Sequence, residues 1–126
     1  MNDQIRRSLS RGHRIDITTT GRRTGKPRRI EIVFHNIDGR LIISGSPSTR
    51  KRAWIANLEA DPHVTVHLKG GPAQADLAAT ARVITDEAER RAIAEWIVAN
   101  AWRNQDTDKM AAWSPMIEVT IADLAA

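Results

Sequence analysis

The chain of 126 residues contains no cysteine, no tyrosine and only one phenylalanine, beside four tryptophans. Without cysteine it can form no disulfide, no thiolate metal site and no cysteine nucleophile. Its apolar runs are too short to span a bilayer, and residues 1–14 are polar and lack the hydrophobic stretch of a signal peptide. We therefore expect a cytoplasmic protein without stable membrane insertion.

Self-contained catalytic machinery is also missing. The four histidines show no metal-like clustering, and the closest pair, His63 and His67, falls in a predicted strand. Residues four apart in a strand are separated by about 13 Å, which is too far to share one metal ion. Both histidines would face solvent, together with Thr65. No histidine–carboxylate pair is placed by the sequence to activate the serines of residues 44–48, so a serine hydrolase is not expected either.

Alternating apolar and polar residues predict strands with one buried face, and Asp38-Gly39 fits the primed turns that join antiparallel strands. Helical spacing predicts an N-terminal helix or arm, a helix around Trp54, and a third helix capped by Thr85 or Asp86. Residues 103–109 resemble a flexible polar loop. The expected strands are 14–20, 28–35, 40–44, 63–69, 74–84 and 116–121, and the first two helices are 2–11 and 51–60. This pattern predicts one mainly β (α+β) domain over residues 1–126, an antiparallel sheet closed into a small barrel.

Positive charge is concentrated in the N-terminal half. Residues 1–52 hold 13 Lys and Arg against 4 Asp and Glu (+9), whereas residues 53–126 hold 6 against 11 (−5). Such a field attracts an anionic partner, which leaves a phosphorylated or polycarboxylate ligand, nucleic acid or an anionic membrane surface. Phe34 is the only Phe, Tyr or Trp of residues 1–52, so platforms for stacking bases are lacking and we expect no nucleic acid partner.

The densest cationic segment is residues 21–29, where five Lys or Arg side chains and two glycines lie between predicted strands. Glycine lets a ligand approach the backbone closely, and Pro27 stiffens the exit of the turn. Arg23 and Arg28 could form a fork around a phosphate or carboxylate, because guanidinium groups match these oxygens with paired hydrogen bonds. The alternative is a basic surface hairpin.

Two further segments carry candidate binding residues. The loop Ser44, Gly45 and Ser46 offers amides and hydroxyls to a polar ring edge, and Arg50 and Lys51 add charge before the helix. Trp54 would offer an aromatic wall, although a lone helical tryptophan more commonly packs in a core. We expect the remaining tryptophans, Trp96, Trp102 and Trp113, to lie in the core or at an interface.

These residues resemble the deazaflavin-dependent nitroreductase family, the split-barrel reductases that use coenzyme F-420. The resemblance lies in the segments 20–28, 38–40 and 42–46 and in Trp54, Asn57, Leu58 and Pro62. It implies a split β-barrel of the FMN-binding-like kind and an oxidoreductase that transfers hydride from reduced coenzyme F-420 to a quinone, enone or nitro acceptor. It also implies Arg23, Arg28, Arg50 and Lys51 at the anionic part of the coenzyme, Ser44, Gly45 and Ser46 at the ring, and Trp54 and Asn57 in the pocket.

The chain departs from this family in two places. Family members with nitroreductase activity have a lysine and glycines where this chain has residues 47–49, and tyrosines near the C-terminus that are absent here. Two alternatives therefore remain: an FMN-binding split-barrel oxidoreductase, and a non-catalytic module that binds nucleic acid or lipid through its basic half. Split barrels often pair, so a homodimer is a further expectation.

Overall fold

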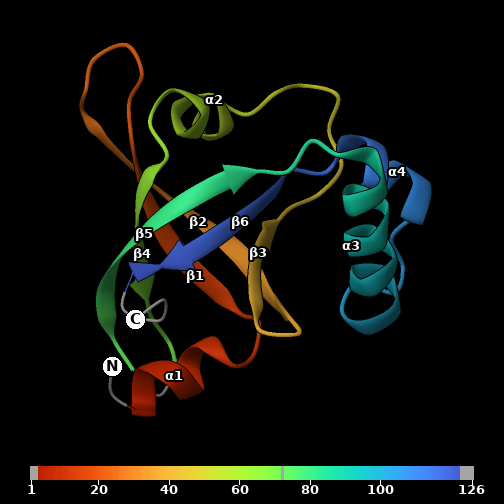
Figure 1. Ribbon diagram of the computed structural model, residues 1–126, viewed down its shortest axis with the longest axis horizontal. Helices are drawn as coiled ribbons and strands as arrows, with labels where there is room; N and C mark the ends of the chain where they lie inside the picture. The colour runs from red at the N-terminus through yellow and green to blue at the C-terminus, as the bar shows by residue number, and fades with distance from the viewer. Residues whose placement is uncertain (1–2, 72, 123–126) are drawn as a thin grey trace.

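The computed structural model describes residues 3–71 and 73–122. Six antiparallel strands close into a barrel in the order β1-β2-β3-β6-β5-β4, with four helices around it (Figure 1). The strands are β1 (Arg14–Thr20), β2 (Pro27–Ile37), β3 (Arg40–Ser44), β4 (His63–Leu68), β5 (Ala75–Val83) and β6 (Met116–Ile121), and the helices are α1 (Asp3–Leu9), α2 (Ala53–Ala60), α3 (Glu87–Asn100) and α4 (Thr107–Trp113). The predicted closed antiparallel barrel is confirmed.

The predicted elements differ from the observed ones mainly at their ends. α2 begins at Ala53, two residues later than expected, and α1 is shorter than the predicted helix 2–11, whose residue 2 lies outside the described residues. Asp86 caps α3, because its side chain accepts a hydrogen bond from the Glu89 amide. The loop predicted over residues 103–109 is wrong at its end: residues 103–106 lie between α3 and α4, but α4 begins at Thr107, where Asp106 caps it by accepting a hydrogen bond from the Lys109 amide.

The barrel interior is filled by the alternating residues of the strands. Ile15 and Ile17 of β1 and Val64 and Val66 of β4 are all buried, as the sequence pattern predicts. The two ends are covered by helices: α1 lies at one end and α2 at the other (Figure 1). The turn between β2 and β3 has positive φ at both Asp38 (52°) and Gly39 (88°), which is the primed geometry expected of this dipeptide.

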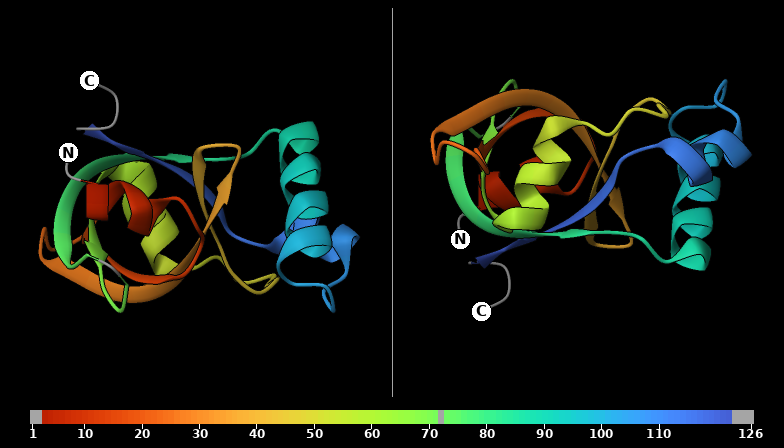
Figure 2. Two further views of the ribbon diagram at one scale, coloured as in Figure 1. Left: turned by 90° about the horizontal axis from the view of Figure 1, so that it is seen from below. Right: turned by 90° about the horizontal axis from the view of Figure 1, so that it is seen from above.

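A second apolar cluster lies outside the barrel, between the sheet and the α3–α4 pair. Ile42 of β3 and Ile97 of α3 are fully buried there, with Met110 of α4. Figure 2 shows α3 and α4 as a separate layer beside the barrel. Trp96 and Trp102 pack against this cluster, in agreement with prediction, whereas Trp113 is 51% exposed. The part of the sheet beneath this layer is therefore covered on both faces.

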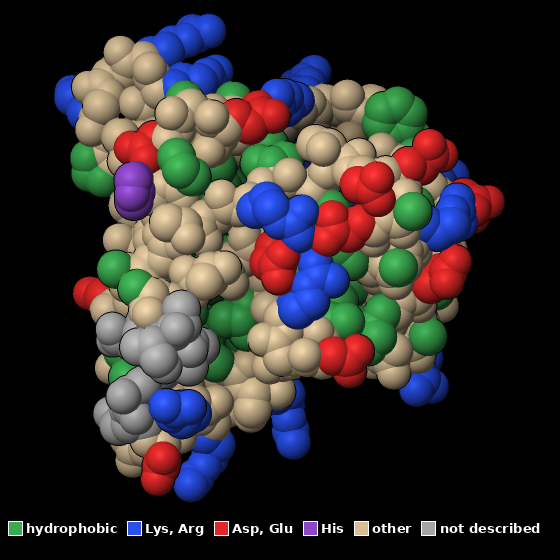
Figure 3. Space-filling model, in the orientation of Figure 1, with side chains coloured by type: hydrophobic (Ala, Val, Ile, Leu, Met, Phe, Trp, Pro, Cys, Tyr) green, Lys and Arg blue, Asp and Glu red, His purple; other side chains and the backbone are tan. Residues whose placement is uncertain are grey.

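Ion pairs hold this outer layer to the sheet. Arg40 and Arg82 both bind Glu89 of α3 and Glu118 of β6, at distances of 2.6 to 3.0 Å. Figure 3 shows alternating acidic and basic side chains over the junction of β5, β6 and α3. Hydrogen bonds from both arginines lower the pKa of Glu89 to about 2, so this cluster stays ionised at neutral pH.

His35 is buried by the second layer. The residue is 4% exposed, and the centre of its ring lies 4.8 Å from the centre of the Trp102 ring in an edge-on arrangement. Its Nε2 atom is buried and has no hydrogen-bond partner among the described residues. Burial lowers the pKa of His35 to about 4. The imidazole is therefore neutral in the folded protein at physiological pH.

Because the buried His35 has a lowered pKa, we expect the stability of the fold to fall at acidic pH. Between pH 6.5 and about 4 the unfolded chain binds a proton that the folded chain does not, so the free energy of unfolding falls as the pH is lowered through this window. From pH 7 to pH 5 we expect a loss of about 2 kcal/mol through this residue. Urea unfolding at the two pH values measures the loss, and His35→Leu should remove most of it. An equal loss in the variant would contradict the prediction.

His67 does not face solvent as expected. It is 8% exposed, and its ring nitrogens lie 2.6 Å from Thr18 Oγ1 and 2.7 Å from Asp76 Oδ1. The partners belong to the strands on either side, β1 and β5, so that the imidazole bridges three strands. The sequence correctly placed Val64, Val66 and Leu68 on the inner face, but the outer face of β4 is covered by neighbouring side chains.

Within the described residues, no helix combines the length and the apolar character needed to cross a bilayer. The same part of the chain contains no group of three or more His, Asp or Glu side chains that could hold a metal ion.

Candidate functional site

The basic turn between β1 and β2 has a defined backbone. The Gly21 amide donates to the Lys26 carbonyl at 2.8 Å, and the Gly25 amide donates to the Gly21 carbonyl at 2.8 Å. Gly25 has a φ of 72°, in the left-handed region that favours glycine. A Cβ at Gly21 would lie 3.0 Å from the Lys26 carbonyl oxygen, so the close approach of the two strands leaves little room for a side chain at this position.

Asn57 ties this turn to α2. Its side-chain oxygen accepts hydrogen bonds from the Arg22 amide at 3.2 Å and from Arg22 Nη1 at 3.1 Å, while its Nδ2 donates to Thr19 Oγ1 at 3.2 Å. Asn57 and Thr19 are both buried. The predicted pocket residue Asn57 is thus the link that fixes the turn against the helix.

Arg23 and Arg28 extend from the turn without partners. Both are exposed, and neither side chain makes a hydrogen bond or ion pair with any residue in the described ranges. They line a cavity of about 470 Å³ together with Arg22, Trp54 and Asn57. In Figure 3 cationic side chains gather at the tip of the molecule formed by this turn. Two unpaired guanidinium groups at one cavity are suited to an anion with several oxygens.

The start of α2 faces the same cavity. Arg52 takes the N-cap position but its side chain does not cap the helix, since its guanidinium donates to the Ser46 carbonyl at 2.8 Å. The first turn of the helix holds no acidic residue. The amides of Ala53 and Trp54, which both line the cavity, donate to no residue of the described chain. Unsatisfied amides at a helix N-terminus favour negative charge, so backbone and side chains of this cavity select the same kind of ligand.

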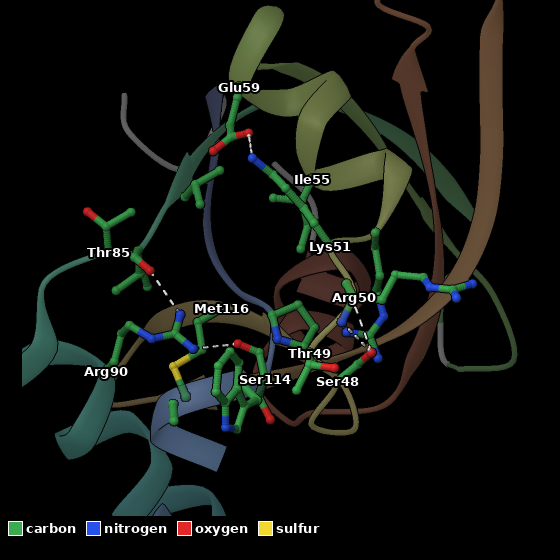
Figure 4. Close-up of a pocket in the computed structure, with 16 residues that line it drawn as sticks. Ser48, Thr49, Arg50, Lys51, Ile55, Glu59, Thr85, Arg90, Ser114 and Met116 are labelled. Carbon is green, nitrogen blue, oxygen red and sulfur yellow. Dashed lines mark hydrogen bonds and ion pairs between the residues drawn. The ribbon is translucent and has the colours of Figure 1, made fainter. Parts of the chain in front are cut away.

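Arg50 and Lys51 line a different cavity, on the other side of α2. It has a volume of about 370 Å³ and lies between the 48–52 loop, the end of β5 and the segment that joins α4 to β6 (Figure 4). Lys51 forms an ion pair with Glu59, whereas the Arg50 side chain has no partner among the described residues. Exposed Trp113 stands in its wall.

The predicted ring-binding loop lines a third cavity, of about 230 Å³. Ser44, Gly45 and Ser46 border it, with Trp102. Ser44 is fully buried, and its Oγ has no hydrogen-bond partner in the described chain. The loop also adjoins the second cavity, because Arg52, which lines that cavity, donates from Nη2 to the Ser46 carbonyl at 2.8 Å. The structure therefore distributes the predicted residues over three cavities rather than one.

Sequence reasoning missed two residues of these cavities. Arg22 is anchored by Asn57, but inside a run of arginines no local signal separates it from Arg23. Arg90 lines the second cavity from the first turn of α3, far from any motif, and only the packing of α3 against α4 brings it there.

The sequence model of one protein family, described as F420H(2)-dependent quinone reductase, matches residues 1–120. The chain belongs to this family. It is therefore an oxidoreductase that depends on coenzyme F-420, and the match confirms the predicted resemblance to deazaflavin-dependent reductases.

Solved structures agree with this family in fold. The reductase superposes on a structure described as an F420-H2 dependent reductase with a TM-score of 0.59 and 22% identity, covering 83% of this chain and 92% of that chain. A putative pyridoxamine 5'-phosphate oxidase from Listeria innocua matches with a TM-score of 0.65 and 18% identity over 95% of this chain and 92% of that one. A putative 5-nitroimidazole antibiotic resistance protein from Bacteroides thetaiotaomicron matches with a TM-score of 0.67 and 15% identity, covering 96% and 80%. The predicted split barrel of the flavin-binding kind is confirmed.

The chemistry of the first cavity fits the coenzyme that this reductase family uses. That coenzyme carries a phosphodiester and an oligoglutamate tail, and the cavity offers two unpaired arginines and two free amides but no acidic side chain. Oxygen anions of both kinds are bound by such donors.

Proposed function

We propose that this reductase transfers hydride from reduced coenzyme F-420 to a quinone. The observation that carries the proposal is the first cavity, which Arg23 and Arg28 line together with the N-terminus of α2. Neither arginine side chain has a hydrogen-bond or ion-pair partner among the described residues. The family match supports the coenzyme, and the cavity supplies the charge that its anionic part needs.

The residues of the site divide the work of binding. Arg23 and Arg28 hold the phosphate and acidic tail, and the Ala53 and Trp54 amides donate to the same oxygens. Asn57 keeps the turn in place before the ligand arrives, which lowers the ordering cost of binding. When bound, the coenzyme supplies the hydride, and the protein contributes position, electrostatics and exclusion of water.

The ring and the acceptor meet at the side of α2 that carries the second cavity. Arg52 of this cavity donates to the Ser46 carbonyl at 2.8 Å, so the loop predicted to bind the ring adjoins it. Exposed Trp113 and buried Met116 offer apolar surface to a flat acceptor. Trp113 thereby supplies an aromatic wall in a chain that lacks the tyrosines of its nitroreductase relatives.

Titration of the purified protein with coenzyme F-420 tests the proposal. We expect a dissociation constant of tens of micromolar or tighter, followed by absorbance or fluorescence of the coenzyme, and oxidation of the reduced coenzyme upon addition of a quinone. FMN serves as the comparison ligand, since it presents a phosphate to the same turn. Absence of coenzyme binding, or a yellow protein that retains FMN during purification and binds it more tightly, would overturn the proposal.

A further inference from the structure

The second cavity carries an excess of positive charge. Four cationic side chains line it, from Arg50, Lys51, Arg52 and Arg90, against the single carboxylate of Glu59. Glu59 is paired with Lys51. Three guanidinium groups are therefore left without a carboxylate partner among the residues that line the cavity, and a cavity of this kind concentrates anions.

Arg90 is the most confined of these groups. Its guanidinium donates to three backbone carbonyls, through Nε to Ala111 at 2.8 Å, Nη1 to Ile84 at 3.0 Å and Nη2 to Ser114 at 2.6 Å. Figure 4 shows Arg90 at the wall of the cavity and the hydrogen bond that its guanidinium makes to Ser114. Carbonyl dipoles fix its orientation but leave its full charge uncompensated. Of its five N–H donors, two remain for a ligand.

Arg90 is half-buried, and this partial loss of water disfavours its charge. Desolvation lowers the pKa of Arg90, and no acid within the described residues forms an ion pair with it. A guanidinium removed from water is stabilised when an anion binds beside it. The cavity also has apolar surface, because Ile55, Val83, Trp113 and Met116 contribute to its lining beside polar residues such as Ser48 and Thr85. The ligand that satisfies both features has an apolar body and one negative charge.

We propose that the second cavity binds a flat organic anion with its charge at Arg90, and that the acceptor of this reductase is a quinone bearing an ionised hydroxyl group. The assignment of this ligand as acceptor rests on the proposed function, whereas the binding itself does not require the coenzyme. The anionic tail of the coenzyme has its own cations, Arg23 and Arg28, in the first cavity.

A matched pair of ligands tests the proposal on the wild-type protein. 2-Hydroxy-1,4-naphthoquinone is an anion at neutral pH, and 2-methoxy-1,4-naphthoquinone has nearly the same shape but cannot ionise. By calorimetry without coenzyme, the anion should bind about tenfold more tightly, the usual value of one charge-assisted contact, and added salt should narrow the difference. Equal affinity for the two ligands would overturn the proposal.

Variants of Arg90 test whether the charge of the ligand binds at this residue. Arg90→Gln should remove the preference for the anion, whereas Arg90→Lys keeps the charge and should retain at least part of it. Arg91→Gln is the control, because Arg91 is the next residue but pairs with Asp108 on the outer surface. Circular dichroism checks that each variant folds. If Arg90→Gln does not fold, the ratio of the two ligands' affinities is compared between Arg90→Lys and the wild type, and a complete loss of the preference in Arg90→Lys would contradict the proposal. An undiminished preference in Arg90→Gln would contradict the proposal.

Competition between the coenzyme and the hydroxyquinone for binding distinguishes this proposal from the proposed function. If the coenzyme binds but displaces the hydroxyquinone, the cavity belongs to the coenzyme and the acceptor assignment fails. If the hydroxyquinone binds through Arg90 and the coenzyme does not bind at all, the anion site stands and the proposed function fails. Binding of both together supports each.

Discussion

Replacement of Arg23 and Arg28 together by glutamine should weaken the binding of coenzyme F-420 by about 100-fold or more. Each guanidinium that binds an anionic oxygen contributes about 1.5 to 3 kcal/mol, and two such contacts are lost. Stability should not change, because neither side chain contacts another residue of the described chain through a hydrogen bond or ion pair. Coenzyme titration and thermal unfolding of the same samples measure the two quantities.

The control must lower the net charge by the same amount at a different place. Arg6 lies in α1 and Arg103 precedes α4, and both are exposed and free of ion pairs within the described part of the chain. The double variant Arg6→Gln and Arg103→Gln should bind the coenzyme within about twofold of wild type, since exposed charges beyond a Debye length are largely screened. A comparable loss in both double variants would mean that only net charge matters and that the turn is no binding site.

Asn57→Ala should lower the free energy of unfolding by about 2 to 3 kcal/mol. The substitution removes the acceptor of two bonds from Arg22 and the donor of one bond to Thr19, and it leaves polar groups near the barrel end unpaired. The turn then loses its link to α2, so coenzyme affinity should also fall, by about tenfold, although Arg23 and Arg28 remain. Urea unfolding and coenzyme titration report the two effects.

Asn100→Ala provides the matched control for this substitution. Asn100 lies exposed at the end of α3, where its side chain donates to the Trp96 carbonyl and makes no other hydrogen bond to a described residue. Its loss should change stability by less than about 0.5 kcal/mol, as is usual for exposed positions, and leave coenzyme binding unaltered. If Asn57→Ala bound the coenzyme as tightly as Asn100→Ala, the hydrogen bonds of Asn57 to the turn would not be needed for coenzyme binding, and the prediction would be wrong.

The strands and their closure could be predicted because the information is local. Alternation through Ile15 and Ile17, or through Val64 and Val66, marks one buried face wherever the strand lies in the sheet. The Asp38-Gly39 turn likewise needs only its own two residues. These features fix an antiparallel sheet of short strands, and six such strands with few helices favour a barrel.

The outer faces of the strands could not be predicted in this way. His67 is buried because Thr18 and Asp76 lie on neighbouring strands, 49 and 9 residues away in sequence, and their register is set by the whole barrel. His35 alternates like an exposed residue, but it is buried beneath Trp96 of α3 and Trp102 of the segment that follows α3. A periodic pattern identifies one covered face but not a second layer on the other face.

The cavities depend on even longer-range packing. The spacing of Arg23, Arg50 and Ser44 suggested a single site, because loops at one end of a barrel lie close together. α2 instead passes between them, with Trp54 and Asn57 toward one cavity and Ile55 and Glu59 toward the other. Which face of a short helix meets which loop is decided by its docking angle, and the sequence of α2 contains no signal for it.

Closure of the barrel has a consequence for the tendency of the protein to aggregate at high concentration. Because β1 pairs with β4 as well as with β2, the sheet has no outermost strand whose backbone could recruit a strand from a neighbouring molecule. Sheets with such a strand are templates for aggregation, and many proteins protect it with lysines, prolines or bulges. Here the closed topology itself gives that protection, without a need for charged or bulged edge strands.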